Sequence, residues 1–252
     1  MSFAHGLDYS QHQGVVDWKQ AAAGGAEFAY IRAAYGLATD TQFSANWYNS
    51  HYFGVLRGAY HFVLYNVDPI AQAKVMASLI FNDMGDLDPA ADAELEANIK
   101  APPDSADRLW AYLNQLEAGV GRTPAIYTSA YYWSLIGNRD PKWRKFRLWV
   151  ADPNHKDKPL VPEPWGPDEW EFWQYGTLAD ASWFGVRTNS NLIDHNWFHG
   201  DHYHLVARYA PHLLPQPEPP PAAEPPAPLP EPTLEERIAR LEEQAKSHGW
   251  SL

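Results

Sequence analysis

Cysteine is absent from the 252 residues of this chain. The absence excludes disulfide-stapled scaffolds, cysteine-ligated zinc sites and thiol nucleophiles. Positive charge is scarce as well, because 19 lysines and arginines stand against 31 aspartates and glutamates and give a net charge of −12. So acidic a chain argues against nucleic acid or an anionic membrane surface as its main partner.

Long apolar runs and targeting segments are also missing. The longest apolar stretch, Val75–Phe81, is too short to cross a bilayer, so we expect no membrane insertion. The first residues show neither the basic segment nor the apolar core of a signal peptide, which predicts synthesis in the cytoplasm without one. No glycine-rich loop follows any expected strand, which disfavours a nucleotide-binding fold. The sequence implies no cofactor.

Aromatic residues, in contrast, are abundant: 12 tryptophans, 14 tyrosines and 10 phenylalanines make up 14% of the chain. Trp and Tyr combine a flat apolar face with a polar edge, so they fill protein cores and also stack on sugar rings. We expect most of these aromatic residues to belong to the core and a minority to bind a ligand.

Proline marks a change of organisation near residue 211. Eleven of the 22 prolines fall within residues 211–232, where Ala, Glu and Leu separate them. Such a segment cannot bury a core and predicts an extended, semi-rigid linker. We therefore divide the chain into a folded domain over residues 1–210, the linker, and a short C-terminal helix within residues 233–252.

The C-terminal segment carries the signals of an amphipathic helix. Thr233 and Glu236 match the capping box that starts a helix. The apolar positions then follow the 4-3-4 spacing of a coiled coil: Leu234, Ile238, Leu241 and Ala245. So short a repeat is marginal in water. A homo-oligomer held by this helix and a frayed single helix both agree with the pattern.

Strand and helix signals alternate over the first 210 residues. The expected strands are Ala4–Tyr9, Phe28–Ala33, Val55–Val63, Leu87–Ala91, Ala125–Tyr127, Arg147–Ala151, Glu171–Tyr175 and Asn191–Ile193. Helix starts lie between them at Asp17 and at Asp68-Pro69, and Gly85 can end the second of these helices. A further helix is predicted by an apolar stripe that ends at Gly119: Leu109, Tyr112, Leu113 and Leu116. The alternation predicts an α/β fold with a parallel sheet and helical crossovers. A closed barrel and an open doubly wound sheet both satisfy it.

Acidic residues fall where several of these strands end. Asp8 ends the first strand, and Asp194 follows the last. Asp92 and Glu94 follow the fourth strand two positions apart, so both side chains point the same way. Asp152 ends the sixth strand. In a closed barrel the first and last strands are neighbours, which brings Asp8 and Asp194 together.

A cluster of acids at one edge of a barrel has a chemical use. Carboxylates held together are costly to ionise together, so one member keeps its proton to an unusually high pH. Glycoside hydrolysis needs such a protonated acid for the leaving oxygen and further carboxylates to stabilise the cationic transition state. Carboxylates that cap loops or form ion pairs are the alternative reading of the same residues.

A series of short motifs runs along about the first 200 residues. In chain order they are Gly6-Leu7-Asp8-Tyr9-Ser10-x-x-Gln13, Val16-Asp17-Trp18, Phe28–Ala33, Asn46, Gly54, Gly58–Phe62, Asp92-Ala93-Glu94, Pro124–Thr128, Leu148–Ala151, Trp173-Gln174-Tyr175 and Ile193-Asp194-x-Asn196. In this order they resemble the glycoside hydrolase family 25 lysozymes, the Chalaropsis-type muramidases. The resemblance implies an irregular TIM-like β/α barrel of eight strands and fewer helices, with a groove at the carboxyl ends of the strands.

The same resemblance assigns roles to residues. Glu94 matches the general acid of the family. Asp92 matches the partner that orients the acetamido group of the substrate or stabilises charge. Asp8 and Asp194 match the other two site carboxylates. The positions expected to line the sugar groove are Tyr60, Trp149, Gln174, Tyr175 and Asp152.

One segment departs from the family pattern. The family reaches its Asp-x-Glu through a hydrophobic strand, whereas this chain has Asp88-Pro89-Ala90-Ala91-Asp92. The run makes a poor strand core. It leaves Glu96 as the nearby alternative to Glu94 for the role of the acid.

The function implied by the resemblance is peptidoglycan hydrolysis. An N-acetylmuramidase of this kind cleaves the β-1,4 bond between N-acetylmuramic acid and N-acetylglucosamine, by double displacement or by substrate-assisted retention. Its partner is the glycan strand of the bacterial cell wall, which a phage endolysin reaches after release. Two alternatives stay open: a catalytically inactive glycan-binding barrel, and a module of a phage structural assembly.

Histidines cluster near the end of the folded domain, at His195, His199, His202 and His204. Their spacing lacks the glutamate of a zinc-protease motif and matches no standard zinc site. We therefore predict no metal site and a solvated surface turn. The separate His61 is expected to be a hydrogen-bonded barrel residue rather than a base.

Overall fold

The computed structural model describes residues 3–178, 181–187, 192–215 and 233–247. The chain divides into two units, the first ending at Leu214 and the second starting at Pro215. Within the described ranges, every helix is too short or too polar to cross a membrane.

The first unit is built on a barrel. Within the described residues its strands are β1 (His5–Tyr9), β2 (Phe28–Tyr35), β3 (Ala38–Thr39), β4 (Leu56–Phe62), β5 (Ala90–Asp92), β6 (Ala125–Ser129), β7 (Arg147–Ala151), β8 (Phe172–Leu178) and β9 (Ile193–Phe198). Eight of them close a circuit in the order β1-β2-β4-β5-β6-β7-β8-β9. The short β3 forms a hairpin with β2 outside this circuit. Of the two sheets that the sequence allowed, the chain forms the closed eight-stranded α/β barrel.

The last strand runs against its neighbours. β9 pairs antiparallel with β1 and with β8, whereas the other neighbours in the circuit pair in parallel. The prediction of a strand at Asn191–Ile193 was wrong, because β9 begins at Ile193; Asn191 itself lies outside the described residues. Since β9 begins at the edge where β1 ends, Asp194 still lies opposite Asp8.

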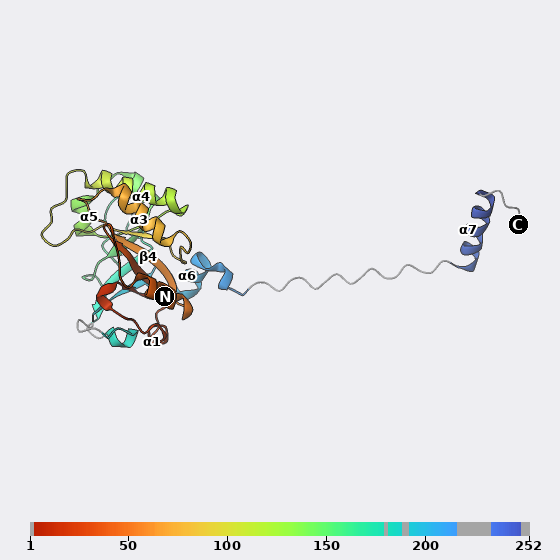
Figure 1. Cartoon of the computed structure of the whole chain (residues 1–252), viewed down its shortest axis with the longest axis horizontal. Helices are drawn as coiled ribbons and strands as arrows, with labels where there is room; N and C mark the ends of the chain where they lie inside the picture. Colours follow the sequence, from red (N-terminus) through yellow and green to blue (C-terminus); the bar gives the residue numbers. More distant parts are fainter. Residues whose placement is uncertain (1–2, 179–180, 188–191, 216–232, 248–252) are drawn as a thin grey trace. The chain divides into compact units, whose positions relative to one another are not determined.

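Helices connect the strands and cover the barrel: α1 (Trp18–Ala23), α2 (Phe43–Tyr52), α3 (Pro69–Ile80), α4 (Ser105–Val120), α5 (Ala130–Ile136) and α6 (His202–Tyr209). Asp17 and Asp68 accept backbone N–H groups at the starts of α1 and α3, as the sequence predicts. α3 and α4 lie side by side on the outside of the barrel (Figure 1). α3 ends at Ile80, before the stop that the sequence predicts at Gly85.

Large rings fill the inside of the barrel: Phe28, Tyr30, Trp149, Phe172 and Phe198. The residues beside them must be small. A Cβ on Gly58 would lie 2.5 Å from the Tyr30 ring, and Ala90 belongs to the same interior cluster. Because the rings already fill the space, an alanine-rich strand fits there. The segment that departed from the family pattern therefore does form a strand, β5.

The outer faces of the strands pack against the helices. The predicted apolar stripe of α4 is fully buried there: Leu109, Tyr112, Leu113 and Leu116. The first unit continues beyond the predicted boundary at residue 210, because Pro211–Leu213 form a 3-10 turn and Leu214 packs against the interior cluster. The rest of the predicted linker, residues 216–232, lies outside the described residues.

The described part of the second unit is α7 (Leu234–Ser247). The predicted capping box is present, because Glu236 Oε2 accepts the Thr233 N–H at 2.8 Å and Thr233 Oγ1 accepts the Glu236 N–H at 3.3 Å. Leu234, Ile238 and Leu241 are exposed in α7. The Ala245 side chain lies outside the described set.

Candidate active site

Four carboxyl groups gather at one end of the barrel. Asp8 lies on β1 opposite Asp194 on β9, Asp92 ends β5, and Glu94 follows two residues later. The groups lie close enough to act on one another, because the charges of Asp194 and Glu94 raise the pKa of Asp8 and the charge of Asp8 raises the pKa of Asp92. The structure thus brings together the four acids that the sequence singled out.

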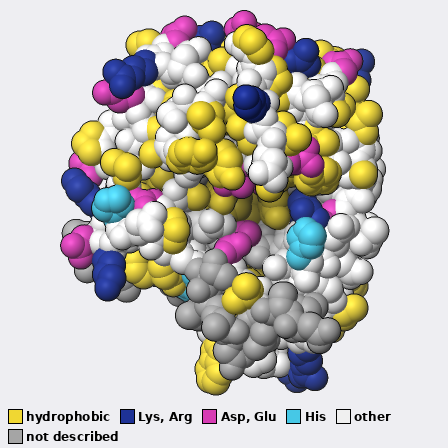
Figure 2. All heavy atoms as spheres, turned by 90° about the vertical axis from the view of Figure 1, so that its left-hand side faces the viewer, with side chains coloured by type: hydrophobic (Ala, Val, Ile, Leu, Met, Phe, Trp, Pro, Cys, Tyr) yellow, Lys and Arg dark blue, Asp and Glu magenta, His cyan; other side chains and the backbone are white. Residues whose placement is uncertain are grey.

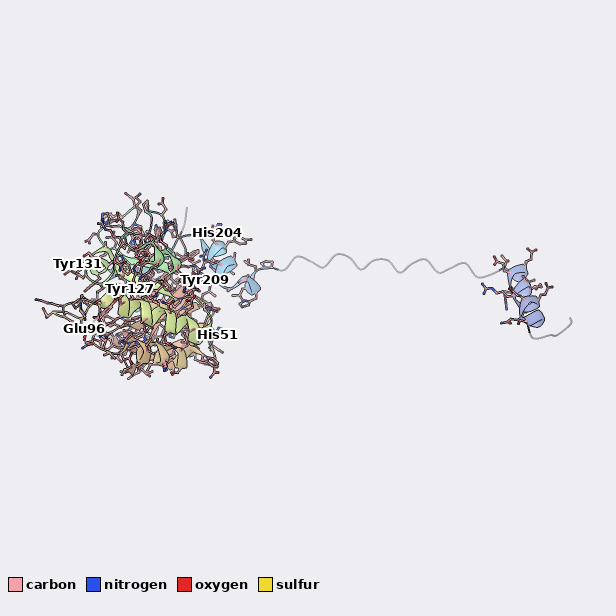
Figure 3. All side chains as sticks on the ribbon, turned by 90° about the horizontal axis from the view of Figure 1, so that it is seen from above. His51, Glu96, Tyr127, Tyr131, His204 and Tyr209 are labelled. Atoms are coloured by element: carbon pink, nitrogen blue, oxygen red, sulfur yellow. The ribbon has the colours of Figure 1, made fainter. Side chains whose placement is uncertain are left out.

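The end of the barrel that carries these acids is the end where β5 and β6 stop. In Figure 3, Glu96 and Tyr131, which follow these two strands, lie at the left, away from Tyr209 and His204 of α6. Figure 2 shows this left-hand face: acidic side chains lie in a hollow at its centre, with hydrophobic side chains around them. A polymer that reaches this face meets the acids in a recess bordered by apolar surface.

Asp8 is held by two amide groups. Its Oδ2 accepts the side-chain N–H of Asn196 and that of Gln174, each at 2.9 Å. Asn196 is oriented in turn by Trp149, whose indole N–H donates to Asn196 Oδ1 at 2.7 Å. The hydroxyl of Tyr127 donates to Gln174 Oε1 at 2.8 Å. The carboxyl group therefore occupies a fixed position in the recess.

Burial and mutual repulsion raise the pKa values of the cluster. Burial, followed by the negative charge of Asp194, raises the pKa of Asp8 to about 8, while the two amide donors oppose this shift. The same two causes raise the pKa of Glu94 to about 7. Burial, followed by the charges of Glu94 and Asp8, raises the pKa of Asp92 well above its usual value. The cluster therefore retains protons near neutral pH, as the sequence argument requires.

Asp92 has a buried oxygen that no described protein group contacts by a hydrogen bond. Its side chain is 6% exposed, and Oδ1 has no hydrogen-bond partner among the described residues. The positive charge of Arg32 lowers the pKa of Asp92, against the larger effect of burial. Arg32 itself pairs with Asp40 at 2.8 Å. A buried acceptor without a partner is costly in a folded protein unless a ligand or water uses it.

The predicted groove residues have different surroundings. Tyr60 lies at the cluster, because the charges of Asp8 and Asp92 raise the pKa of its hydroxyl after burial does. Trp149 is 2% exposed and stacks on Tyr30 with ring centroids 4.2 Å apart, so it forms the floor below Asn196 rather than an open stacking surface.

Two further predicted residues point elsewhere. Tyr175 follows Gln174 on β8 and stacks on Trp197 at 4.0 Å in the outer layer, away from the interior face that carries the acids. The Asp152 carboxylate accepts the backbone N–H groups of Asn154 at 3.1 Å and Leu160 at 2.7 Å, so it holds its own loop. The structure does not bring either residue to the acid cluster, and their role in sugar binding stays a prediction.

The alternative acid, Glu96, is engaged outside the cluster, because it accepts a hydrogen bond from the Tyr35 hydroxyl. The pKa of Glu94, in contrast, is raised by burial and by the charge of Asp194, as a general acid needs. The position of Glu94 therefore favours it over Glu96.

The histidines divide into three environments. His195 is buried on β9 and lies 2.8 Å from His5, so the prediction of a solvated turn was wrong for this residue. The prediction fits His199, which is exposed in the bend after β9. His202 and His204 are exposed as predicted, but they belong to helix α6 rather than to a turn. His61 is buried between the Gly36 carbonyl and the Tyr112 hydroxyl, which confirms the hydrogen-bonded barrel histidine. No group of metal-binding side chains occurs within the described ranges.

The sequence analysis missed Tyr127 and Asn196 as site residues. Only Asn196 has a signal in the pattern. Asn196 follows Asp194 by two positions and so shares its face of the strand. Tyr127 pairs with Asp92 in the register of β5 and β6, which only the fold reveals.

Residues 7–181 match the family model described as glycosyl hydrolases family 25. The match covers more than half of the chain and spans three of the four clustered acids: Asp8, Asp92 and Glu94. This chain belongs to glycosyl hydrolase family 25. It is accordingly a glycoside hydrolase, with the irregular α/β barrel of that family.

Relatives and solved structures agree with the family model. Lysozyme M1 of Streptomyces globisporus is 31% identical over 217 residues, which cover 82% of this chain and 71% of the relative. The N,O-diacetylmuramidase of Arthroderma benhamiae is 29% identical and covers 71% of this chain and 78% of its own length. The solved bacterial lysozyme of Streptomyces coelicolor superposes with a TM-score of 0.70 at 29% identity, covering 83% of this chain and 98% of that one.

Proposed function

We propose that this glycoside hydrolase is an N-acetylmuramidase that cleaves the β-1,4 bond between N-acetylmuramic acid and N-acetylglucosamine in peptidoglycan. The observation that carries the proposal is the acid cluster in its recess, with Glu94 at a pKa of about 7. The names of the relatives, a lysozyme and a muramidase, point to the same substrate.

Glu94 acts as the general acid. Its raised pKa keeps the carboxyl group protonated up to neutral pH, so it can give its proton to the leaving glycosidic oxygen. As that bond breaks, positive charge develops on the sugar ring. The negative charge of Asp194, which acts on both Asp8 and Glu94, lies close enough to Glu94 to stabilise this cation.

Asp92 orients the substrate. The unpartnered Oδ1 is an acceptor in a buried position beside Glu94, and the N–H of a 2-acetamido group is a donor of matching kind. An amino sugar would therefore satisfy an atom that the described protein groups leave unsatisfied. This supports an N-acetylated glycan over an ordinary polysaccharide.

The decisive test is Glu94→Gln. The amide keeps the shape of the side chain but cannot donate the acid proton, so release of new reducing ends from purified peptidoglycan should fall by about 10²–10⁴. Glu96→Gln is the matched control and should digest at close to the wild-type rate, because Glu96 binds Tyr35 outside the cluster. Digestion by Glu94→Gln at the wild-type rate would overturn the proposal, and mass spectrometry of the new ends identifies the bond cleaved.

The setting of the reaction is the bacterial cell wall, as in bacteriolysis by an endolysin. An inactive glycan-binding barrel is not favoured, because a binder gains nothing from four acids whose mutual repulsion must be overcome on folding. A purely structural role in a phage assembly is not favoured for the same reason.

The second part of the proposal concerns α7. Leu234, Ile238 and Leu241 leave 71%, 47% and 63% of their surfaces exposed in α7. An Ile at position a with Leu at the flanking d positions favours a two-stranded parallel coiled coil. In that register Arg237 at position g meets Glu242 at position e of a second copy, whereas an antiparallel pair would place Glu235 beside Glu242. We infer that α7 pairs two copies of this chain in parallel.

A further inference from the structure

A groove lies between α5 and residues 160–163, which belong to the segment that joins β7 to β8. Its volume of about 560 Å³ is in the range of sites that hold small ligands. Residues 160–163 form one side of it. The other side is a single face of α5 and its C-terminal cap, with the i, i+3, i+4, i+7 spacing of residues that share a helix face: Ala130, Trp133, Ser134 and Gly137. This α5 groove therefore follows the whole length of the helix.

Hydrogen bonds hold the two sides of the α5 groove in place. Asp152, directly after β7, accepts the Leu160 N–H at 2.7 Å. Trp133 of α5 donates its indole N–H to the Glu163 carbonyl at 2.7 Å and so ties one side to the other. The Asp152 and Trp133 side chains are buried, which shelters both bonds from water. The groove is thus preformed, and Asp152 helps to hold it open although it lies outside the acid cluster.

One end of the α5 groove lies beside the acid cluster. α5 begins directly after β6, whose Tyr127 pairs in register with Asp92. Tyr131, in the first turn of α5, lies at the end of the barrel that carries the acids (Figure 3). The next residue, Tyr132, is close enough to Glu94 for that charge to add to burial in raising the pKa of the tyrosine hydroxyl. A substituent on a sugar held at the acids therefore has this end of the groove next to it.

The lining of the α5 groove matches a peptide better than a sugar. Trp133 is buried, so its ring offers no open face on which a sugar could stack. The large apolar side chain that the groove exposes is Leu160, with 55% of its surface accessible. Ser134 and Asn138 are also exposed and add polar groups that can bond to peptide N–H and C=O groups.

The end of the groove away from the acids carries charge of both signs. Arg139 and Glu163 pair there at 3.0 Å, and both side chains are largely exposed. So exposed a pair contributes little to stability, which leaves each member able to bind a ligand group of opposite charge. The seven residues of α5 give the groove a length of about 10 Å. Three extended peptide residues span about the same length.

We propose that the α5 groove binds the peptide stem that branches from N-acetylmuramic acid. The stem is short, rich in alanine, and carries carboxylate and amino groups. Its methyl groups match the apolar surface of Leu160, and its charges match Arg139 and Glu163. The inference rests on the proposed muramidase function, because a sugar held at the acids is what brings the stem to the groove. It adds that the enzyme prefers peptide-bearing glycan to bare glycan.

The test compares two soluble glycan fragments of equal length, one with its peptide stems and one from which an amidase has removed them. Release of new reducing ends by the full chain gives kcat and KM on each. KM should be about tenfold lower on the peptide-bearing fragment, since burial of two methyl-sized groups supplies about that factor. Equal KM values on the two fragments would overturn the inference.

A variant tests the groove itself. Leu160→Asp replaces its exposed apolar surface by a charge that repels the carboxylates of the stem. KM on the peptide-bearing fragment should rise to the value on the bare fragment, with kcat unchanged on both, because uniform binding is lost. Leu135→Asp is the matched control: Leu135 is 45% exposed on α5, does not line the groove, and should leave both KM values as in the wild type.

The remaining outcomes are equally clear. If Leu160→Asp leaves both KM values unchanged, or raises both by the same factor, the groove is not the site of the stem. Thermal melting checks that both variants fold as the wild type does. The bare fragment separates the two proposals. A wild type that cleaves it without preferring the peptide-bearing fragment refutes the groove alone, whereas a wild type that cleaves neither refutes the proposed function and the groove with it.

Discussion

At the scale of single residues, the site is defined by groups that oppose folding. Asp8, Asp92 and Glu94 all have raised pKa values, and burial is the largest cause in each case. In the unfolded chain such carboxyl groups ionise at a pH of about 4. The folded protein therefore binds more protons than the unfolded chain between about pH 4 and the pKa values of about 7 and 8.

The sign of the pH dependence follows from these shifts. Where the folded state binds more protons, the free energy of unfolding falls as pH rises. The cluster thus stabilises least above pH 8, where its members are ionised together. Neutralising one member should relieve this repulsion at high pH and matter little at low pH.

We expect Asp92→Asn to raise the melting temperature at pH 8 relative to wild type, by several degrees more than at pH 5. Melting curves at the two pH values, measured by circular dichroism, check the difference. Asp17→Asn, which changes an α1-capping carboxyl group outside the cluster, should show no such gain at pH 8. A melting temperature for Asp92→Asn that changes equally at both pH values would contradict the account of the raised pKa values.

At the scale of elements, the barrel depends on small residues beside large rings. β4 and β5 place the small residues Gly58 and Ala90 beside the interior rings. β2 and β7 supply two of these rings, Tyr30 and Trp149. Packed interiors have no room for added atoms, so these strands tolerate little change in side-chain volume on their inner faces.

Gly58→Ala tests this packing. The new Cβ would lie 2.5 Å from the Tyr30 ring and 2.9 Å from Leu87, so we expect a loss of about 1–3 kcal/mol in the free energy of unfolding. Urea denaturation measures it. The control is Gly176→Ala on β8, where a Cβ meets no atom within 4 Å, and there the midpoint should stay close to wild type. Equal losses in both variants would mean that backbone freedom, not ring packing, selects glycine in these strands.

At the scale of the whole molecule, the proposed pairing of α7 gives each assembly two barrels. Two barrels joined through the paired α7 helices can bind separate glycan strands, so weak single contacts combine as avidity. The pairing rests on an apolar face of two heptads, which is a small contact. We therefore expect a dimer that dissociates on dilution.

Light scattering on the full chain should give the mass of a dimer at high micromolar concentration, and Leu241→Asp should return the monomer mass. Ala239→Asp is the matched control, because it adds the same charge to α7 at a position outside the apolar repeat and should leave the dimer intact. A monomer for the unmodified chain at every concentration measured would end the proposal for α7.

The sequence by itself determined which residues supply the acids of the site, the helix caps and the proline-rich segment. The acids at Asp8, Asp92, Glu94 and Asp194 were chosen from their places at expected strand ends, and cap residues such as Asp17 and Asp68 located helices because such signals act within a few residues. The proline-rich segment was visible in composition alone. The family resemblance then supplied roles that strand periodicity could not.

Only the tertiary structure decided how these residues meet. The reversed direction of β9 keeps Asp194 opposite Asp8, and nothing within the strand itself reports its direction. The alanines of β5 form a strand because rings from other strands fill the space beside them. The low strand propensity of alanine, which predicts a poor strand here, is therefore overridden by packing. The hydrogen bonds from Gln174 and Asn196 to Asp8, and from Tyr127 to Gln174, join strands far apart in the chain. Which residues meet in such contacts depends on how distant segments pack, and a linear sequence does not encode it residue by residue.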